Sequence, residues 1–249
     1  MRALTTLLIF VAFTSLHADW RVIENENIST PTAALQHFHV TLEDQSKAQM
    51  DVLLFRERDL KFHVVDNPGN ELGLDEAMQK QAGDAGVNGG FFHPDGTPLG
   101  LLISEGKQIH PLEHARLLSG LVVVTPTRMA LLRTAELKST KGVQEAIQAG
   151  PFLVDHGKAV VGLNNQRAAA RTVVASDGKG HFALILCRVV TLAEMANLLA
   201  TPGMIPQMKV ERALNLDGGS SSAMWVKGNP DFYSAEGKRV RNFLAIRPR

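Results

Sequence analysis

The amino-acid sequence predicts one α+β domain with a mixed or antiparallel β-sheet core and a few flanking helices. Hydrophobic residues make up 45% of the 249 residues, which is enough to fill the core of one large domain. Most apolar runs are short and end at glycine, proline, asparagine or aspartate, as β-strands do. Apolar residues at helical spacing are confined to a few stretches, so we expect strands to dominate the fold.

The main domain is expected to span residues 51–249, after an N-terminal segment at 19–50. Residues 19–34 of that segment are polar and read as a mature N-terminal segment or an edge strand. Helices are expected at 74–81, at 142–147 and after Thr191, where Thr191 and Glu194 form a capping box. The expected strands are short apolar runs bounded by turn residues, at 38–42, 51–55, 61–66, 85–88, 98–104, 107–109, 121–124, 129–132, 152–154, 173–175, 181–187 and 241–246.

Residues 1–18 have the pattern of a secretory signal peptide. Met1 and Arg2 give it a positively charged start, residues 3–13 are almost wholly apolar, and Ala18 is a small residue at the expected cleavage site. The alternative is a membrane anchor, but the apolar run is too short to span a bilayer comfortably. We therefore expect an exported protein, periplasmic or secreted by a bacterium, with no stable membrane span once the signal peptide is removed.

Cys187 is the only cysteine, so the chain cannot form an intramolecular disulfide. It lies in an apolar run, where a thiol is typically a small core residue rather than a nucleophile. An exported chain without disulfides fits a bacterial periplasm better than a lysosome or the extracellular space, where disulfides are common in small domains.

The charge pattern argues against a nucleic-acid partner. The formal net charge is +1, acidic and basic residues are interspersed, and no block of lysine and arginine stands out. The sequence also shows no Ser-His-Asp pattern, no P-loop and no dinucleotide-binding fingerprint.

The stretch from Ala213 to Trp225 is the strongest candidate for a site. An apolar strand ends there in Asp217, and the residues that follow are Gly218, Gly219, Ser220 and Ser221. The two glycines allow a sharp turn, and the N–H groups of Gly218 to Ser221 are expected to converge on an anion. The alternative is a tight hairpin, because Asp-Gly between two apolar runs is a strong turn signal.

A second candidate segment follows the strand at 85–88. Asn88 offers both an acceptor and a donor to a sugar hydroxyl or a phosphate oxygen. Gly89 and Gly90 then turn the backbone, and Phe91 supplies apolar anchoring. Here too the alternative is a simple Asn-Gly hairpin turn.

Two further positions complete the candidate site. Arg171 lies at the mouth of the strand at 173–175, where its guanidinium is expected to clamp a phosphate through parallel N–H donors. Arg167 is a weaker candidate for the same role, and a surface salt bridge is the alternative for both. Gly150, just before Pro151, is expected to allow a close approach of the backbone.

Four segments, at 87–101, 148–153, 171–172 and 213–225, together resemble the phosphodiester glycosidase family. Its best-known member is a lysosomal enzyme that removes N-acetylglucosamine from a phosphodiester, and the resemblance covers residues 51–246. Asn242 stands where family members often have a polar residue. The chain departs from the family pattern at two positions, where Ser220 and Ala175 replace glycines that many members carry. Both departures bear on which substrate the site accepts.

The resemblance implies an exported hydrolase that cleaves a sugar from a sugar 1-phosphate diester, with envelope material or exopolysaccharide as one source. Its catalytic residues would be Asp217 as acid or base, Arg171 as phosphate clamp, and Asn88 to orient the sugar or the attacking water. The expected substrate-binding residues are Gly89, Gly90, Phe91, Gly150, Gly218, Gly219, Ser220, Ser221 and Asn242. No cofactor is certain, but Asp217 and Asn88 are plausible oxygen ligands for Mg²⁺ or Ca²⁺. The alternative function is a non-catalytic module that binds a glycan or sugar phosphate at the cell envelope.

Overall fold

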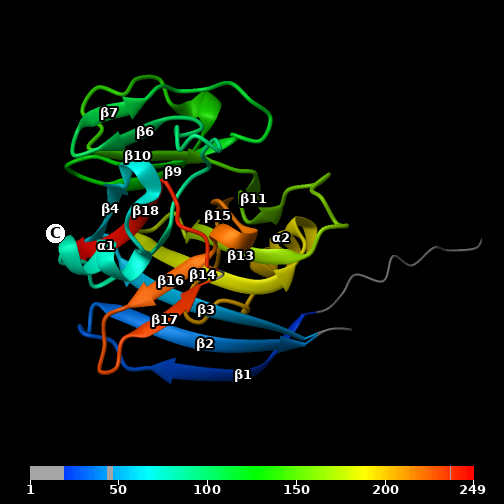
Figure 1. Cartoon of the computed structure of the whole chain (residues 1–249). Coiled ribbons are helices and arrows are strands. Elements are labelled where there is room, and N and C mark those ends of the chain that lie inside the picture. The colour runs from blue at the N-terminus through cyan, green and yellow to red at the C-terminus, as the bar shows by residue number, and fades with distance from the viewer. Residues whose placement is uncertain (1–19, 44–46, 236) are drawn as a thin grey trace, which may run out of the picture.

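The computed structural model describes residues 20–43, 47–235 and 237–249, so the expected signal peptide lies outside the described residues. The described residues form a largely β fold, with three antiparallel sheets and two α-helices. This agrees broadly with the predicted α+β class and its few flanking helices. In Figure 1 the sheet that contains β6 (Leu102–Ser104), β7 (Lys107–His110) and β10 (Glu145–Ala149) lies at the top of the view. The long strands β1 (Arg21–Ile28), β2 (Leu35–Glu43) and β3 (Lys47–Arg56) lie at the bottom. None of the described helices is long and apolar enough to cross a membrane.

The largest sheet has eight strands in the order β1-β2-β3-β14-β13-β15-β11-β12, and every neighbouring pair is antiparallel. β1 is an exposed edge strand, as the polar sequence predicts, and β2 pairs along its length with β3, which runs across residue 51. The bounds are β1 (Arg21–Ile28), β2 (Leu35–Glu43), β3 (Lys47–Arg56), β14 (His181–Val190), β13 (Ala169–Ser176), β15 (Arg212–Asn215), β11 (Phe152–Asp155) and β12 (Lys158–Ala159).

The two smaller sheets have five strands each. The second sheet runs β7 (Lys107–His110), β6 (Leu102–Ser104), β10 (Glu145–Ala149), β8 (Gly120–Val124) and β9 (Met129–Arg133). The third sheet runs β17 (Phe232–Ala235), β16 (Ala223–Val226), β5 (Ala85–Asn88), β18 (Asn242–Pro248) and β4 (Leu60–Asp66). The three sheets share one buried apolar core, to which β4 contributes Phe62, β10 contributes Ile147 and β14 contributes Leu184.

The helices are α1 (Leu74–Lys80) and α2 (Leu192–Ala200), with short 3₁₀ turns at η1 (Pro68–Asn70), η2 (Thr134–Glu136) and η3 (Gly219–Ser221). The predicted capping box of α2 is confirmed, because the Glu194 N–H donates to Thr191 Oγ1 at 3.1 Å and the Thr191 N–H donates to Glu194 Oε2 at 2.7 Å. α2 then buries Met195 and Leu198 in a second apolar core on the other face of the largest sheet.

The prediction of a helix at 142–147 is wrong. Glu145–Ala149 forms β10, which pairs with β8 on one side and with β6 on the other. Val143, Ala146 and Ile147 match helical spacing, but all five residues of β10 are buried in the middle of a sheet. Tertiary pairing has overridden a short local pattern, as it often does for strands.

Candidate active site

The segment around Asp217 joins two different sheets. β15 ends at Asn215 in the largest sheet, and β16 begins at Ala223 in the third sheet. Asp217 lies in the crossing between them. The hairpin alternative is therefore wrong for this segment. It is also wrong for Asn88-Gly89, because β5 and the next strand, β6, belong to different sheets.

The side chain of Asn88 holds the main chain of this crossing in place through hydrogen bonds. Its Nδ2 donates to the main-chain carbonyl of Asp217 at 2.7 Å, and its Oδ1 accepts from Thr172 Oγ1 at 2.7 Å and from the Ala223 N–H at 3.1 Å. Asn88 is 0% exposed. Because its amide is occupied by the protein itself, the structure places Asn88 beneath Asp217 rather than in contact with solvent.

A cavity of about 250 Å³, here called the Asp217 cavity, opens beside this crossing. It brings together six of the residues that the sequence predicts for the site, which are Asp217, Arg171, Phe91, Gly150, Gly218 and Gly219. Asn88, Gly89, Gly90, Ser220, Ser221 and Asn242 do not line it. Residues from β13, the β5–β6 connection and the β15–β16 crossing therefore meet at one place. The remaining lining residues are Leu117, Pro151, Arg167, Ala169, Leu192 and Asn215.

The Asp217 carboxyl is held in a poorly hydrated place. Burial raises its pKa above the usual aspartate value of 3.8. A hydrogen bond from Ser221, the Gly218 N–H at 2.8 Å from Oδ1 and the positive charge of Lys238 all oppose this increase. Asp217 is the only carboxylate among the described residues that line the cavity. A carboxyl whose pKa is raised is suited to proton transfer closer to neutral pH.

Arg171 presents an uncompensated positive charge to the cavity. Its Nε donates to the Val190 carbonyl at 3.1 Å and its Nη2 donates to the Arg167 carbonyl at 2.6 Å, which fixes the plane of the guanidinium. Burial and the neighbouring charge of Arg167 lower the pKa of Arg171. Within the described part of the chain, neither arginine has a carboxylate within salt-bridge distance. Two arginines without counter-ions favour an anionic ligand.

A bulge in β14 sets the carbonyl that Arg171 contacts. The register between β13 and β14 shifts between Ala169 and Arg171, so that β14 carries an extra residue there. Val189, within this bulge, has a φ of 55°, a conformation that is strained for a β-branched side chain, and it is 72% exposed. Strained backbone of this kind often accompanies functional sites. Here it positions the Val190 carbonyl against the Arg171 guanidinium.

Three of the predicted glycines, Gly89, Gly90 and Gly150, are closely packed. The Gly89 N–H donates to the Asn242 carbonyl at 2.9 Å, and the Gly90 N–H donates to Asn242 Oδ1 at 2.8 Å. A Cβ on Gly89 would lie 1.9 Å from Asn242 Oδ1, and one on Gly150 would lie 1.9 Å from the Leu117 carbonyl oxygen. The structure therefore places Asn242 as a support for the two glycines, buried away from the cavity.

The expected convergence of four N–H groups is only partly present. The Gly218 N–H donates to Asp217, and the Ser221 N–H donates to the Gly218 carbonyl at 3.3 Å. Both are therefore occupied within the segment. Gly219, which lines the cavity, has a φ of 60°, a conformation that favours glycine. Ser220 is exposed, and its carbonyl accepts from the Lys238 N–H at 3.0 Å.

Asn215 is a cavity residue that the sequence analysis did not single out. The missed signal was its spacing, because a polar residue two positions before Asp217 points to the same face of an extended strand. Leu117, Pro151 and Leu192 were also missed, and together with Phe91 they form an apolar wall. Leu117 and Pro151 lie in loops that no local pattern predicts, and Leu192, the first residue of α2, reaches the cavity only through the tertiary arrangement.

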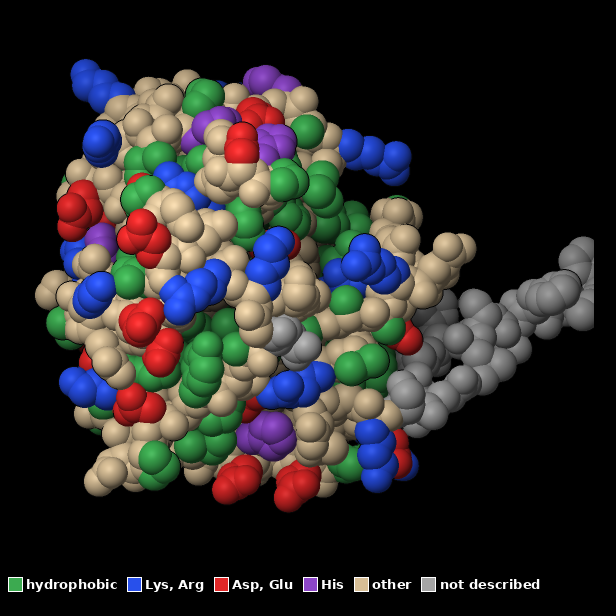
Figure 2. Space-filling model, viewed as in Figure 1, with side chains coloured by type: hydrophobic (Ala, Val, Ile, Leu, Met, Phe, Trp, Pro, Cys, Tyr) green, Lys and Arg blue, Asp and Glu red, His purple; other side chains and the backbone are tan. Residues whose placement is uncertain are grey.

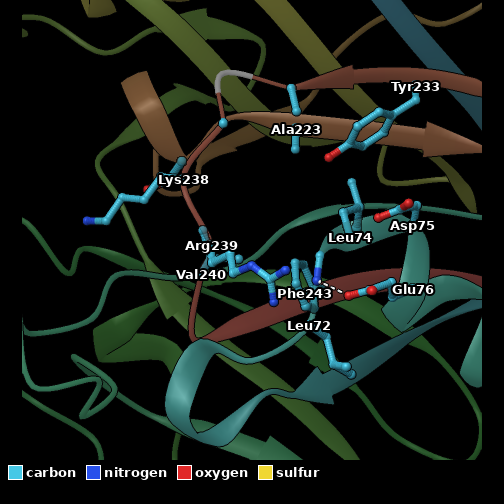
Figure 3. A pocket seen from close by; sticks show the side chains of 14 residues that line it. Leu72, Leu74, Asp75, Glu76, Ala223, Tyr233, Lys238, Arg239, Val240 and Phe243 are labelled. Carbon is cyan, nitrogen blue, oxygen red and sulfur yellow. Dashed lines mark hydrogen bonds between the residues drawn. The ribbon is translucent and has the colours of Figure 1, made fainter.

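A second cavity, of about 300 Å³, lies against α1 and is separate from Arg171 and Gly150. Figure 3 shows Leu74 and Asp75 of α1 facing Tyr233 and Ala223 across it, while the Lys238 amine points away. Glu76 is engaged there as the cap of α1, accepting from the Gly73 N–H at 2.9 Å. Although larger, this cavity has fewer of the predicted site residues, since only Ser221 lines it.

Asn88 is not free to act as the second of the two oxygen ligands expected for a metal ion. Asn88 Oδ1 already accepts two hydrogen bonds, and the Asn88 side chain lies beneath the Asp217 main chain rather than beside its carboxylate. No group of three or more His, Cys, Asp or Glu side chains among the described residues has the geometry to hold a metal ion.

On the face shown in Figure 2, basic and acidic side chains are interspersed.

Residues 82–247 match the phosphodiester glycosidase family, which confirms the resemblance drawn from the motifs. Among solved structures, the chain is similar to the zebrafish N-acetylglucosamine-1-phosphodiester alpha-N-acetylglucosaminidase catalytic domain auto-inhibited by its pro-peptide, with a TM-score of 0.65 and 17% identity over 91% of this chain and 88% of that one.

Two other solved structures share the fold. A hypothetical protein from Synechocystis has a TM-score of 0.63 and 16% identity over 91% of this chain, which spans only 64% of that protein. A putative exported protein from Burkholderia pseudomallei has a TM-score of 0.59 and 14% identity over 82% of this chain and 75% of that one. No curated protein matches the chain.

Proposed function

The chain belongs to the phosphodiester glycosidase family, and from that membership we propose that it is a hydrolase that releases a sugar from a sugar 1-phosphate diester. One observation carries the proposal. A carboxyl of raised pKa, Asp217, and two arginines without counter-ions, Arg171 and Arg167, line the same cavity of about 250 Å³. A phosphodiester supplies the anion, and its glycosidic bond needs a proton-transfer group nearby.

The arginine side of the cavity holds the phosphate in this proposal. The guanidinium of Arg171 is fixed by the Val190 and Arg167 carbonyls, so its remaining N–H groups are oriented before the substrate arrives. Fixed donors need no reorganisation when charge builds up on the leaving group, and this makes them effective in catalysis. Arg167, which is more exposed, adds a second positive charge at the rim.

Asp217 provides the proton transfer. Water attacks the anomeric carbon and gives its proton to the Asp217 carboxylate, while the bond between that carbon and the bridging oxygen breaks. The bridging oxygen leaves with the electron pair as part of a phosphate monoester, whose charge Arg171 stabilises. Because this leaving group is a weak base, it needs no proton from a second carboxylate. The products are the free sugar and the phosphate monoester.

The apolar wall accommodates the sugar ring. Phe91, Leu117 and Leu192 lie on the cavity surface, and Leu117 is 47% exposed. Apolar and aromatic side chains of this kind pack against the C–H faces of ligands, while a few polar groups fix their orientation. For the cellular setting we propose export on the basis of the N-terminal pattern, with envelope or exopolysaccharide material as the source of substrate.

The test is product analysis on purified protein. Methyl phosphodiesters of glucose, galactose and N-acetylglucosamine 1-phosphate are incubated in H₂¹⁸O, with and without a chelator. The proposal predicts release of free sugar together with methyl phosphate that carries no ¹⁸O, because water attacks carbon and the bridging oxygen stays on phosphorus. Label in the phosphate would show cleavage of the phosphorus–oxygen bond instead and would overturn the glycosidase mechanism. Binding without any product would favour the non-catalytic module.

A further inference from the structure

Asn215, which lines the Asp217 cavity, carries a buried acceptor that has no partner among the described residues. Asn215 is 3% exposed, and its Oδ1 makes no hydrogen bond within the part of the chain that the structure describes. A buried polar atom without a partner costs about 1–3 kcal/mol, and such atoms are rare in folded proteins. The vacancy therefore needs a physical reason.

The orientation of the Asn215 amide is fixed by its other end. Nδ2 donates to the Gly150 carbonyl at 3.0 Å and to the Leu216 carbonyl at 2.5 Å. These two bonds use both hydrogens of the amide nitrogen. A reversed amide would place Oδ1 against two carbonyl oxygens, which repel it. The amide orientation is therefore fixed, and Oδ1 remains able to accept a hydrogen bond.

The position of Asn215 points to the ligand as the missing partner. Asn215 lines the Asp217 cavity together with Asp217, Arg167 and Arg171. The two arginines can only donate hydrogen bonds, and Asp217 is engaged by Gly218 and Ser221. Among the described residues that line the cavity, Asn215 is thus the only one with a side-chain amide, whose oxygen is a neutral acceptor.

The chemistry of the substrate decides which part of it Asn215 meets. A phosphodiester anion has no hydrogen to donate, so its oxygens are matched by the arginines and not by Asn215 Oδ1. The donor must come from the sugar, as a ring hydroxyl or the N–H of an acylamino group. This step depends on the proposed function, since it takes a sugar phosphate as the ligand.

We propose that Asn215 is a specificity-determining residue, which accepts a hydrogen bond from one hydrogen-donating substituent of the sugar ring. A site that buries an acceptor for a substrate donor discriminates against analogues that lack the donor, because the acceptor then stays unpaired. A loss of about 1–3 kcal/mol corresponds to a decrease of roughly 10- to 100-fold in kcat/KM for the analogue without that substituent.

The experiment must separate this role from a structural one, because Asn215 also holds Gly150. Wild type and Asn215→Leu are compared on the methyl phosphodiesters of glucose 1-phosphate, its 2-, 3-, 4- and 6-deoxy analogues, and N-acetylglucosamine 1-phosphate. For each substrate the ratio of kcat/KM between wild type and variant is taken, so that the intrinsic reactivity of each analogue cancels.

The inference predicts that one deoxy position removes the effect of the substitution. On the parent sugar the ratio is roughly 10- to 100-fold, and on the analogue that lacks the donor it falls close to one. A structural role would instead lower activity on every substrate by the same factor. Equal ratios across the series, or a wild type that is indifferent to every deoxy change, would overturn the inference.

Two further measurements keep the test decisive. If Asn215→Leu does not fold, Asn215→Ala is used, because it removes Oδ1 and places no oxygen against the Gly150 and Leu216 carbonyls. It must then lose the discrimination between parent and deoxy sugar, and discrimination equal to that of wild type counts against the inference. If wild type releases no sugar from any diester, the proposed function fails. Binding of the same methyl sugar 1-phosphodiesters to wild type and variant is then measured by calorimetry. The ratio of Kd between variant and wild type must fall close to one for the analogue that lacks the donor, and equal ratios across the series overturn the inference.

Discussion

The side-chain amide of Asn88 donates a 2.7 Å hydrogen bond to the main-chain carbonyl of Asp217, across 129 positions of sequence. The Asp217 N–H in turn donates to the Gly89 carbonyl at 3.1 Å. These two bonds join the end of β5 to the crossing between β15 and β16. The position of the proposed catalytic carboxyl therefore depends on a buried network that a ligand does not reach.

Removal of the Asn88 amide should destabilise the fold and displace Asp217. Asn88→Ala leaves the Ala223 N–H, the Thr172 hydroxyl and the Asp217 carbonyl without their partner, which is expected to cost about 2–4 kcal/mol in the free energy of unfolding. Urea denaturation measures this cost. Thr172→Val is the matched control, since it removes one of these bonds only and should cost less. An Asn88→Ala midpoint equal to that of wild type would contradict the network.

The stability of the protein should depend on pH through Asp217. Its pKa is raised in the folded state by burial, so protonation favours the folded form. This contribution is fully present below the unfolded value of 3.8 and is lost as pH rises through the folded pKa. Asp217→Asn removes the ionisation. We therefore expect the variant to gain stability relative to wild type as pH rises from acid to neutral, in thermal unfolding followed across that range.

Asp95 offers a control of the opposite sign. Hydrogen bonds from Thr97 lower the pKa of Asp95, so its contribution is present above the unfolded value and is lost as pH falls through the folded one. Asp95→Asn should therefore lose stability relative to wild type as pH rises. If both variants follow wild type in parallel at every pH, the raised pKa of Asp217 is contradicted.

Gly89 should not tolerate a side chain. Gly89→Ala places a Cβ 1.9 Å from Asn242 Oδ1 and 2.9 Å from the Asn242 carbonyl oxygen, so the contacts at the end of β5 must shift. We expect a loss of about 1–3 kcal/mol, measured by denaturation. Gly83→Ala is the matched control, because the nearest atom to its Cβ would be Met78 Sδ at 3.5 Å, an ordinary contact. Equal stability of the two variants would show that Gly89 is not closely packed.

Relief of the strained bulge should stabilise the protein. Val189 is 72% exposed and has a φ of 55°, so Val189→Asn removes little burial while it introduces a residue that adopts this conformation more readily. We expect a gain of about 0.5–1 kcal/mol in the free energy of unfolding, with sugar release unchanged. Val161→Asn, at a position that is 91% exposed and has no positive φ, should have almost no effect. A Val189→Asn variant less stable than the Val161→Asn control would argue against strain.

The parts of this fold that sequence predicts well are those with local causes. The capping box of Thr191 and Glu194 specifies the start of α2 from side-chain chemistry within one turn. Short apolar runs ending in turn residues gave most strand positions for the same reason. The segment at 142–147 failed because its burial between β8 and β6 comes from residues far away in sequence.

The candidate site likewise contains residues that local sequence indicates and residues whose position depends on distant contacts. Residue types and the family motifs point to Arg171 as an anion-binding group and to Asp217 as a proton-transfer group. Both line the cavity, and their roles stay predictions. The burial of Asn88 was not predictable, since only the meeting of the largest sheet with the third sheet shows that Thr172 and Ala223 occupy its Oδ1. A side chain able to bind a ligand is equally able to bind the protein, and sequence alone does not distinguish the two.

Sugar release from a methyl sugar 1-phosphodiester, by wild type, Asp217→Asn and Arg171→Ala, tests the central claim most directly. Arg128→Ala, an exposed arginine outside the Asp217 cavity, is the control, and thermal unfolding verifies that each variant is folded. The account predicts that wild type and Arg128→Ala release sugar at similar rates, while each of the other two is slower by roughly 100- to 1,000-fold. Wild-type rates from folded Asp217→Asn and Arg171→Ala would contradict it.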